Sequence, residues 1–171
     1  MYRIIFAILV LIMFSFSSYG QKAAAGAAKP DPSKAVRDAF ERLAEGIRQV
    51  DADKVMSVYA NNADILFFNN NGSVTRGWQT MKENRVSSYG KTKNVTLEIT
   101  GLKIEMLGAR SAYVTCKWKQ QQEYEGKLET ASGRMTLIFA LTGKDWKVVH
   151  LHTSPDNPGP TRPVFDSERT N

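Results

Sequence analysis

Residues 132–155 read SGRMTLIFALTGKDWKVVHLHTSP, and this stretch decides the fold. From Met135 to Leu141 every second residue is apolar, which is the two-residue period of a β-strand. Gly143-Lys144-Asp145 then supplies a turn, and a second run extends from Trp146 to Ser154. Two long runs joined by a short turn predict an antiparallel hairpin.

The same period continues upstream of this hairpin. Val95-Leu97-Ile99, Ile104-Met106 and Ala112-Val114-Cys116-Trp118 alternate with polar residues, and turns are expected at residues 108–110 and near Gly126. Long strands separated by short turns indicate an antiparallel meander rather than βαβ units.

The N-terminal half has a helical period instead. Apolar residues recur at three- and four-residue intervals from Val36 to Val50, which predicts an amphipathic helix with Ser33 as its N-cap. A second helix is expected from Asp51, a short buried strand over residues 64–68, and a third helix from Trp78 to about residue 90. Helices followed by a curled antiparallel sheet predict an α+β fold.

The two ends of the chain differ from this domain. A basic start, an apolar run over residues 4–16 and the small residues Ser18 and Gly20 predict a signal peptide at 1–20. The run is shorter than the roughly 20 residues that span a bilayer. We therefore expect a periplasmic or secreted protein with no stable membrane anchor after cleavage. Residues 21–32 are predicted to be a flexible linker, 33–155 the domain and 156–171 a disordered tail.

Composition narrows the functional classes. The net charge is +6, but lysines and arginines are scattered and no aromatic-basic stripe is present, so we predict no nucleic-acid partner. Cys116 is the only cysteine, so an internal disulfide is impossible, and its place in an alternating strand favours a small buried hydrophobe.

Four segments in order resemble one superfamily. They are SVTRGWQTM at 73–81, AYVTCKW at 112–118, SGRMTLIF at 132–139 and DWKVVHLHTSP at 145–155. The set is similar to SnoaL-like domains of the nuclear transport factor 2-like superfamily, and resembles the association domain of calcium/calmodulin-dependent protein kinase II. The resemblance implies a cone-shaped sheet wrapped around three N-terminal helices, with a pocket inside the cone.

His150 and His152 are the only histidines, and they lie two residues apart on one strand, so they share a face. One interpretation places them at the mouth of the cone, where they would bind an anion or exchange a proton. A structural role within the sheet is a second interpretation. A metal site would need Glu123 or Glu125 as a third ligand, and no recognised spacing supports it. We predict no metal and no cofactor.

Arg134 opens the penultimate strand. Facing the cavity, its guanidinium would suit a carboxylate; facing outward, it would be a surface charge. Aromatic candidates for pocket walls are Tyr59, Trp78, Tyr89, Tyr113 and Trp118. The predicted ligand-binding residues are Tyr59, Trp78, Tyr113, Arg134, His150 and His152.

Two functions follow from the resemblance. Ketosteroid isomerases place a catalytic carboxylate late in the first strand, whereas residues 59–70 read YANNADILFFNN, with Phe67 or Phe68 at that position. An aromatic side chain cannot abstract a proton. We therefore expect a non-catalytic ligand-binding or assembly domain that takes an anionic small molecule. It would form a homodimer or higher homo-oligomer through the outer sheet face, which carries Lys117, Lys119, Gln121, Thr136 and Ile138. The alternative is an isomerase, cyclase or hydratase.

Overall fold

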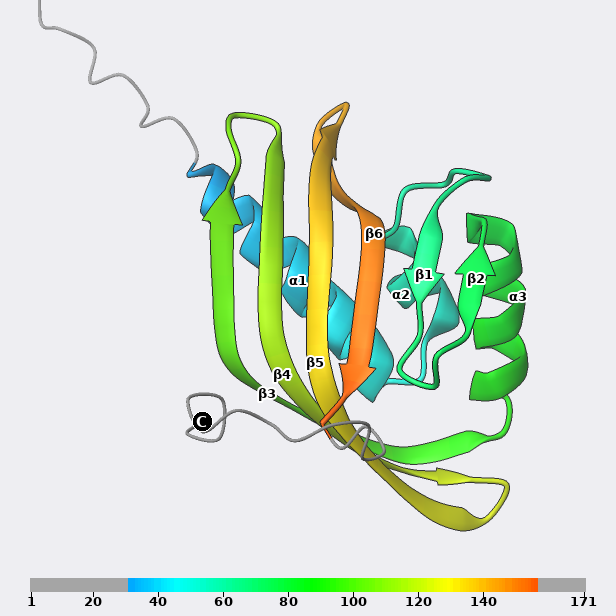
Figure 1. Cartoon of the computed structure of the whole chain (residues 1–171). Coiled ribbons are helices and arrows are strands. Elements are labelled where there is room, and N and C mark those ends of the chain that lie inside the picture. Colours follow the sequence, from blue (N-terminus) through cyan, green and yellow to red (C-terminus); the bar gives the residue numbers. More distant parts are fainter. Residues whose placement is uncertain (1–30, 157–171) are drawn as a thin grey trace, which may run out of the picture.

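The computed structural model describes residues 31–156 (Figure 1). The elements are α1 (Pro32–Arg48), α2 (Ala52–Ser57), β1 (Leu66–Phe68), β2 (Val74–Arg76), α3 (Trp78–Tyr89), β3 (Thr92–Met106), β4 (Ser111–Tyr124), β5 (Lys127–Thr142) and β6 (Asp145–Pro155). The predicted α+β fold is confirmed: three helices pack against a curled sheet that does not close. The signal peptide, nearly all of the linker and residues 157–171 of the tail lie outside the described residues.

The sheet has six strands in the order β2-β1-β6-β5-β4-β3. The four long strands β3 to β6 form the predicted antiparallel meander. β1 pairs with β6 in parallel, with Phe68 opposite His152, so the loop after β1 lies beside the end of β6. None of the helices among residues 31–156 is long and apolar enough to cross a membrane.

The helix α1 crosses one face of the sheet and lies behind it in Figure 1. That face is concave and carries the core, whose fully buried large side chains are Phe40, Phe67, Phe139, Leu43, Met56, Leu137, Val36, Val55, Val58, Val114 and Val148. Cys116 is also buried there, as expected. The opposite face, called the outer face below, faces the reader in Figure 1.

The predicted N-cap of the first helix is wrong by two residues. The helix begins one residue before Ser33, and the carboxylate of Asp31 accepts hydrogen bonds from the backbone N–H of Ser33 at 2.9 Å and from its hydroxyl at 2.8 Å. A carboxylate caps a free backbone N–H as well as a hydroxyl does, and Pro32 fits the first helical turn. Asp51 caps α2 in the same way.

A β-bulge in β6 decides which side chains reach the core. Ile138 lies opposite His150 and Phe139 lies opposite Val148, so Val149 is an extra residue in β6. The bulge changes the alternation of the strand. Trp146 is consequently buried in the core, whereas His150 and His152 point to the outer face. The prediction that these three side chains share one face is wrong for this reason.

Gly133 allows Trp118 and the backbone of β6 to lie close to β5 on the concave face. A Cβ atom at this position would overlap the backbone oxygen of Ser154 and lie 3.1 Å from the Trp118 ring. The absence of a side chain therefore lets the indole of Trp118 lie over β5 while β6 stays paired with it.

Candidate ligand-binding site

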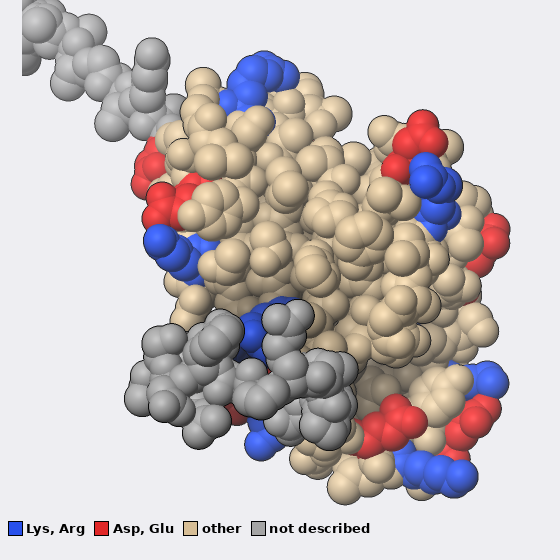
Figure 2. All heavy atoms as spheres, viewed as in Figure 1, with Lys and Arg blue, Asp and Glu red and all other residues tan. Residues whose placement is uncertain are grey.

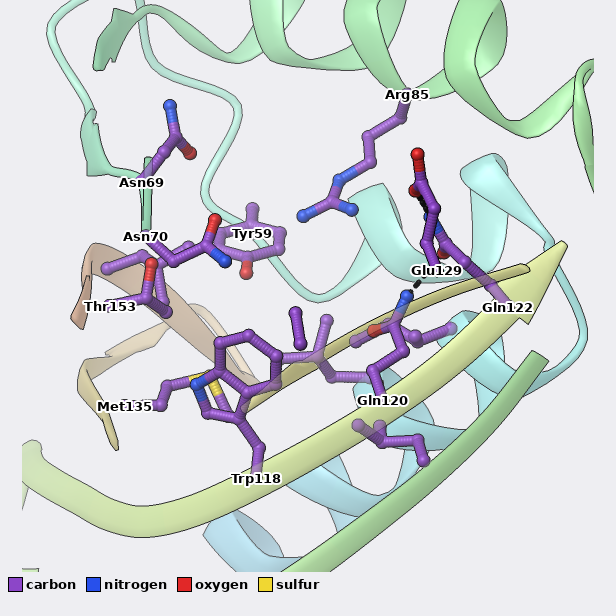
Figure 3. A pocket seen from close by; sticks show the side chains of 15 residues that line it. Tyr59, Asn69, Asn70, Arg85, Trp118, Gln120, Gln122, Glu129, Met135 and Thr153 are labelled. Atoms are coloured by element: carbon purple, nitrogen blue, oxygen red, sulfur yellow. Dashed lines mark hydrogen bonds between the residues drawn. The ribbon is translucent and has the colours of Figure 1, made fainter. Parts of the chain in front are cut away.

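A cavity of about 340 Å³ opens between the helices and the concave face of the sheet (Figure 3). It extends from α1 and α3 across β3, β4, β5 and β6 to the loop after β1. Its lining residues are Leu43, Ile47, Tyr59, Asn69, Asn70, Arg85, Leu97, Trp118, Gln120, Gln122, Glu129, Ala131, Met135, Leu151 and Thr153. Apolar side chains from α1 and the sheet thus line one part of the cavity, and polar groups from the loop after β1, from α3 and from β4, β5 and β6 line the rest.

Tyr59 lies at the inner end of this cavity. Its ring packs against Phe67 with the centroids 5.0 Å apart, and the residue is only 4 % exposed. Burial raises the pKa of the Tyr59 hydroxyl to about 12, an effect that the nearby positive charge of Arg85 partly opposes. At neutral pH the cavity therefore contains a protonated phenol, which can donate a hydrogen bond.

Arg85 brings a positive charge to the cavity from α3. Figure 3 shows its guanidinium directed into the cavity, on the side of Tyr59. Among residues 31–156 no carboxylate lies within ion-pair distance of it. Its Nε atom is buried without a hydrogen-bond partner in that part of the chain, and its guanidinium lies 5.7 Å from the ring centre of Tyr89. The cavity thus has a half-buried cation with no ion-pair partner among the described residues.

A hydrogen-bonded chain crosses the β4–β5 side of the cavity. Nε2 of Gln120 donates to Oε1 of Gln122 at 2.7 Å, and Nε2 of Gln122 donates to Oε2 of Glu129 at 3.0 Å. Trp118 lies next along β4, and its indole N–H is buried without a partner in the described part of the chain. These groups give the cavity directional polar contacts beside its apolar surface.

Of the predicted ligand-binding residues, Tyr59 lines the cavity. Trp78 does not: its indole N–H donates to the backbone oxygen of Met56 at 3.0 Å and so ties α3 to α2. Tyr113 lies on the outer face, opposite Ile138. Trp118, a wall candidate outside the final predicted set, does line the cavity.

Arg134, His150 and His152 also lie on the outer face, so the interpretations that direct Arg134 into the cavity and place the histidines at the mouth of the cone are wrong. The structure brings them close along the ladder, because Arg134 pairs with Ser154 and the next outward residue of β5 pairs with His152. Arg134 is 59 % exposed and lies 3.9 Å from a carboxylate oxygen of Asp156. Both imidazoles lie nearly perpendicular to the Phe68 ring, whose centroid is 5.2 Å from that of His150 and 5.8 Å from that of His152.

The sequence did not predict that four further residues line the cavity: Arg85, Gln120, Gln122 and Glu129. The position of Arg85 could have been predicted from the helical period. Arg85 lies four residues after the buried Met81 and four before Tyr89, so all three share the inward face of α3. Gln120 and Gln122 continue the inward alternation of Trp118 on β4. Polar residues at inward positions are a signal for a cavity, because a close-packed core would exclude them.

Within residues 31–156, no three His, Cys, Asp or Glu side chains gather closely enough to hold a metal ion.

Several solved structures have a fold similar to that of this chain. The structure matches a nuclear transport factor 2-like superfamily protein from Salmonella enterica (TM-score 0.67, 22% identity, covering 77% of this chain and 96% of that one). It also matches a candidate scytalone dehydratase from Novosphingobium aromaticivorans (0.65, 9%, 75% and 95%). A third match is a candidate calcium/calmodulin-dependent kinase II association domain from Exiguobacterium sibiricum (0.65, 11%, 78% and 100%). At these identities the likeness shows the fold alone.

No curated protein shows significant sequence similarity to the chain. The SnoaL-like domain model, however, matches residues 36–158, which include every element of the sheet and nearly all of α1. Together with the curled sheet and the cavity on its concave face, this match shows that the chain belongs to the SnoaL-like domain family, within the nuclear transport factor 2-like fold.

Proposed function

We propose that this protein binds a small organic anion in the cavity on the concave face of the sheet. The observation that supports the proposal is the guanidinium of Arg85, which is directed into the cavity and has no described carboxylate partner. A ligand carboxylate would supply that partner. The apolar part of the same ligand would lie on Leu43, Leu97 and Met135.

Arg85 is suited to bind a carboxylate because of the environment of its charge. Arg85 is half-buried, so its charge is less screened than that of an exposed arginine. A guanidinium can hold a carboxylate through two parallel hydrogen bonds. A hydrogen bond to a charged group contributes about 1.5–3 kcal/mol, which is roughly tenfold to a hundredfold in affinity.

Calorimetric titration with naphthalene-2-carboxylate and with its neutral amide tests this proposal. The acid should bind more tightly than the amide, because only the acid pairs with Arg85. Arg85→Met should weaken binding of the acid by roughly tenfold or more and leave the amide unchanged. Arg37→Met, an exposed position on α1, is the matched control. Equal affinities for acid and amide, or an unchanged affinity in Arg85→Met, would contradict the proposal.

An isomerase, cyclase or hydratase is the alternative function, since a candidate dehydratase shares the fold. Such an enzyme needs an acid or a base in the cavity. Glu129 is the one carboxylate among the described residues that line it, and it already accepts a hydrogen bond from Gln122. We expect mass spectrometry to recover the bound acid unchanged after incubation. A new product that depends on Arg85 and Glu129 would favour the enzyme.

We also propose that a second copy of the chain covers the outer face. Figure 2 shows a broad area without Lys, Arg, Asp or Glu on this face, with charged groups at its margins. Strand register assigns Leu66, Phe68, Tyr113, Thr115, Thr136, Ile138, His150 and His152 to it. An area without these charged side chains can meet its own copy without repulsion between like charges. One structural neighbour is described as an association domain.

Light scattering tests the dimer. Ile138→Lys introduces a charge in the centre of the outer face and should convert the dimer to a monomer that is still folded. Leu128→Lys is the control, because Leu128 is an exposed apolar residue of β5 remote from that centre. A monomeric wild-type protein at micromolar concentration would disprove this association.

Export is a third proposal. Its support is the apolar run at residues 4–16 followed by Ser18 and Gly20. Sequencing of the N-terminus from the native host should begin near Gln21. Protein that retains Met1 in the membrane fraction would contradict it.

A further inference from the structure

The chain of hydrogen bonds from Gln120 through Gln122 to Glu129 has a fixed direction. An ionised carboxylate only accepts hydrogen bonds, so Gln122 must turn its amide N–H₂ toward Glu129. The amide oxygen of Gln122 then faces Gln120 and accepts from its Nε2. Glu129 thus sets the orientation of both amides.

This direction decides which groups of Gln120 are free for a ligand. One N–H of Nε2 is used within the chain and the other stays free, while Oε1 is the acceptor of this amide and accepts no hydrogen bond from the described residues. Figure 3 shows this oxygen turned away from Gln122, on the side of Trp118. Gln120 lines the cavity, and its Oε1 is not among the fully buried atoms that lack a partner. The cavity therefore presents a cation at Arg85 and an acceptor at Gln120.

We propose that the ligand is an organic acid that also carries a hydroxyl group. Its carboxylate pairs with Arg85 and its hydroxyl donates to Oε1 of Gln120, with Glu129 as a positioning residue that acts through Gln122. This inference rests on the proposed anion-binding function and adds the second polar group of the ligand. A hydroxyl fits because it supplies the donor that the acceptor lacks, whereas an ether oxygen in the same place supplies none.

The test compares hydroxynaphthalene carboxylates, which differ in the position of the hydroxyl, with their methyl ethers and with unsubstituted naphthalene-2-carboxylate. In the wild-type protein at least one hydroxy acid should bind about threefold to tenfold more tightly than its methyl ether, as expected for one net hydrogen bond. Gln120→Met should abolish this advantage of the hydroxy acid over its methyl ether.

Glu129→Gln separates positioning from charge. Removing the negative charge should tighten the binding of every acid alike, so the ratio of hydroxy acid to methyl ether is the relevant quantity. That ratio should decrease, because a glutamine at 129 both donates and accepts and no longer fixes the direction of the chain. Gln121→Met is the matched control: Gln121 is the neighbour on β4 that points to the outer face. Circular dichroism and melting temperatures confirm that each variant is folded.

The outcomes separate the two proposals. Loss of the Arg85 dependence for the unsubstituted acid would disprove anion binding itself. An Arg85-dependent acid with no hydroxyl advantage, or an advantage that survives in Gln120→Met, would overturn the hydroxyl assignment alone. A ratio unchanged in Glu129→Gln would overturn the positioning role of Glu129.

Discussion

The two faces of the sheet differ in the kind of polar group that each carries. The cavity on the concave face is lined by three amide or carboxylate side chains of β4 and β5, by the buried phenol of Tyr59 and by Arg85, which has no ion-pair partner among the described residues. The outer face holds both histidines on a broad uncharged area. The residue types that most often signal chemistry therefore lie on the face that we assign to association. Side-chain type alone indicates a function only once the face is known.

The largest expected contrast is between two neighbours on β5. Leu137 is fully buried on the concave face, and Ile138 is 38 % exposed on the outer face. Leu137→Ala removes buried methyl groups and leaves a cavity, so it should lower the free energy of unfolding by about 2–5 kcal/mol. Ile138→Ala should lower it by less than about 1 kcal/mol. Chemical denaturation at one low protein concentration measures both.

The control for this pair lies in the next strand. Val114→Ala on the concave face should resemble Leu137→Ala, and Thr115→Ala on the outer face should resemble Ile138→Ala. Comparable losses from both faces would mean that the outer face is buried in a partner, and would point to an obligate dimer.

The element types, the meander and the family could be predicted from the sequence, because hydrophobic periods of two and of three to four residues report local geometry directly. The face of the histidines could not. The bulge at Val149 is set by how β5 and β6 pair, and no alternation within β6 reveals it. Likewise, the cavity depends on Arg85, which reaches it from a helix separated from the polar strands by a long stretch of chain.

Alkaline pH gives the second contrast, between the tyrosines of the two faces. Burial raises the pKa of Tyr59 from its ordinary value of 10.0 to about 12. A raised pKa means that folding favours the protonated phenol, so its contribution is fully present below pH 10 and is lost as pH rises through about 12. Between pH 9 and pH 12 the free energy of unfolding of the wild-type protein should therefore fall by about 2 kcal/mol more than that of Tyr59→Phe.

Unfolding of both proteins at pH 9 and pH 12 gives this difference directly, because the two proteins differ only at residue 59. Tyr113→Phe on the outer face is the control, since its ring is half-exposed there. An equal loss in Tyr59→Phe and the wild-type protein would show that the phenol is hydrated through the cavity.

The smallest expected effect concerns two arginines: Arg134, a predicted ligand-binding residue that lies on the outer face, and Arg85, which lines the cavity. Arg85 keeps its Nε buried without a partner in the described part of the chain, which costs about 1–3 kcal/mol. The contact of its guanidinium with the Tyr89 ring offsets about 0.5–1 kcal/mol of this. Methionine keeps the apolar stem and removes the charge, so Arg85→Met should raise the free energy of unfolding of the ligand-free protein by about 1 kcal/mol. Arg134→Met should change the free energy of unfolding by less than about 0.5 kcal/mol, because that side chain is exposed and its ion pair is screened.

If Arg85→Met gains stability while it loses affinity for the acid, Arg85 is a group kept for binding. Destabilisation by more than about 1 kcal/mol would instead show that Arg85 holds α3 against the sheet, and the anion proposal would lose its main support.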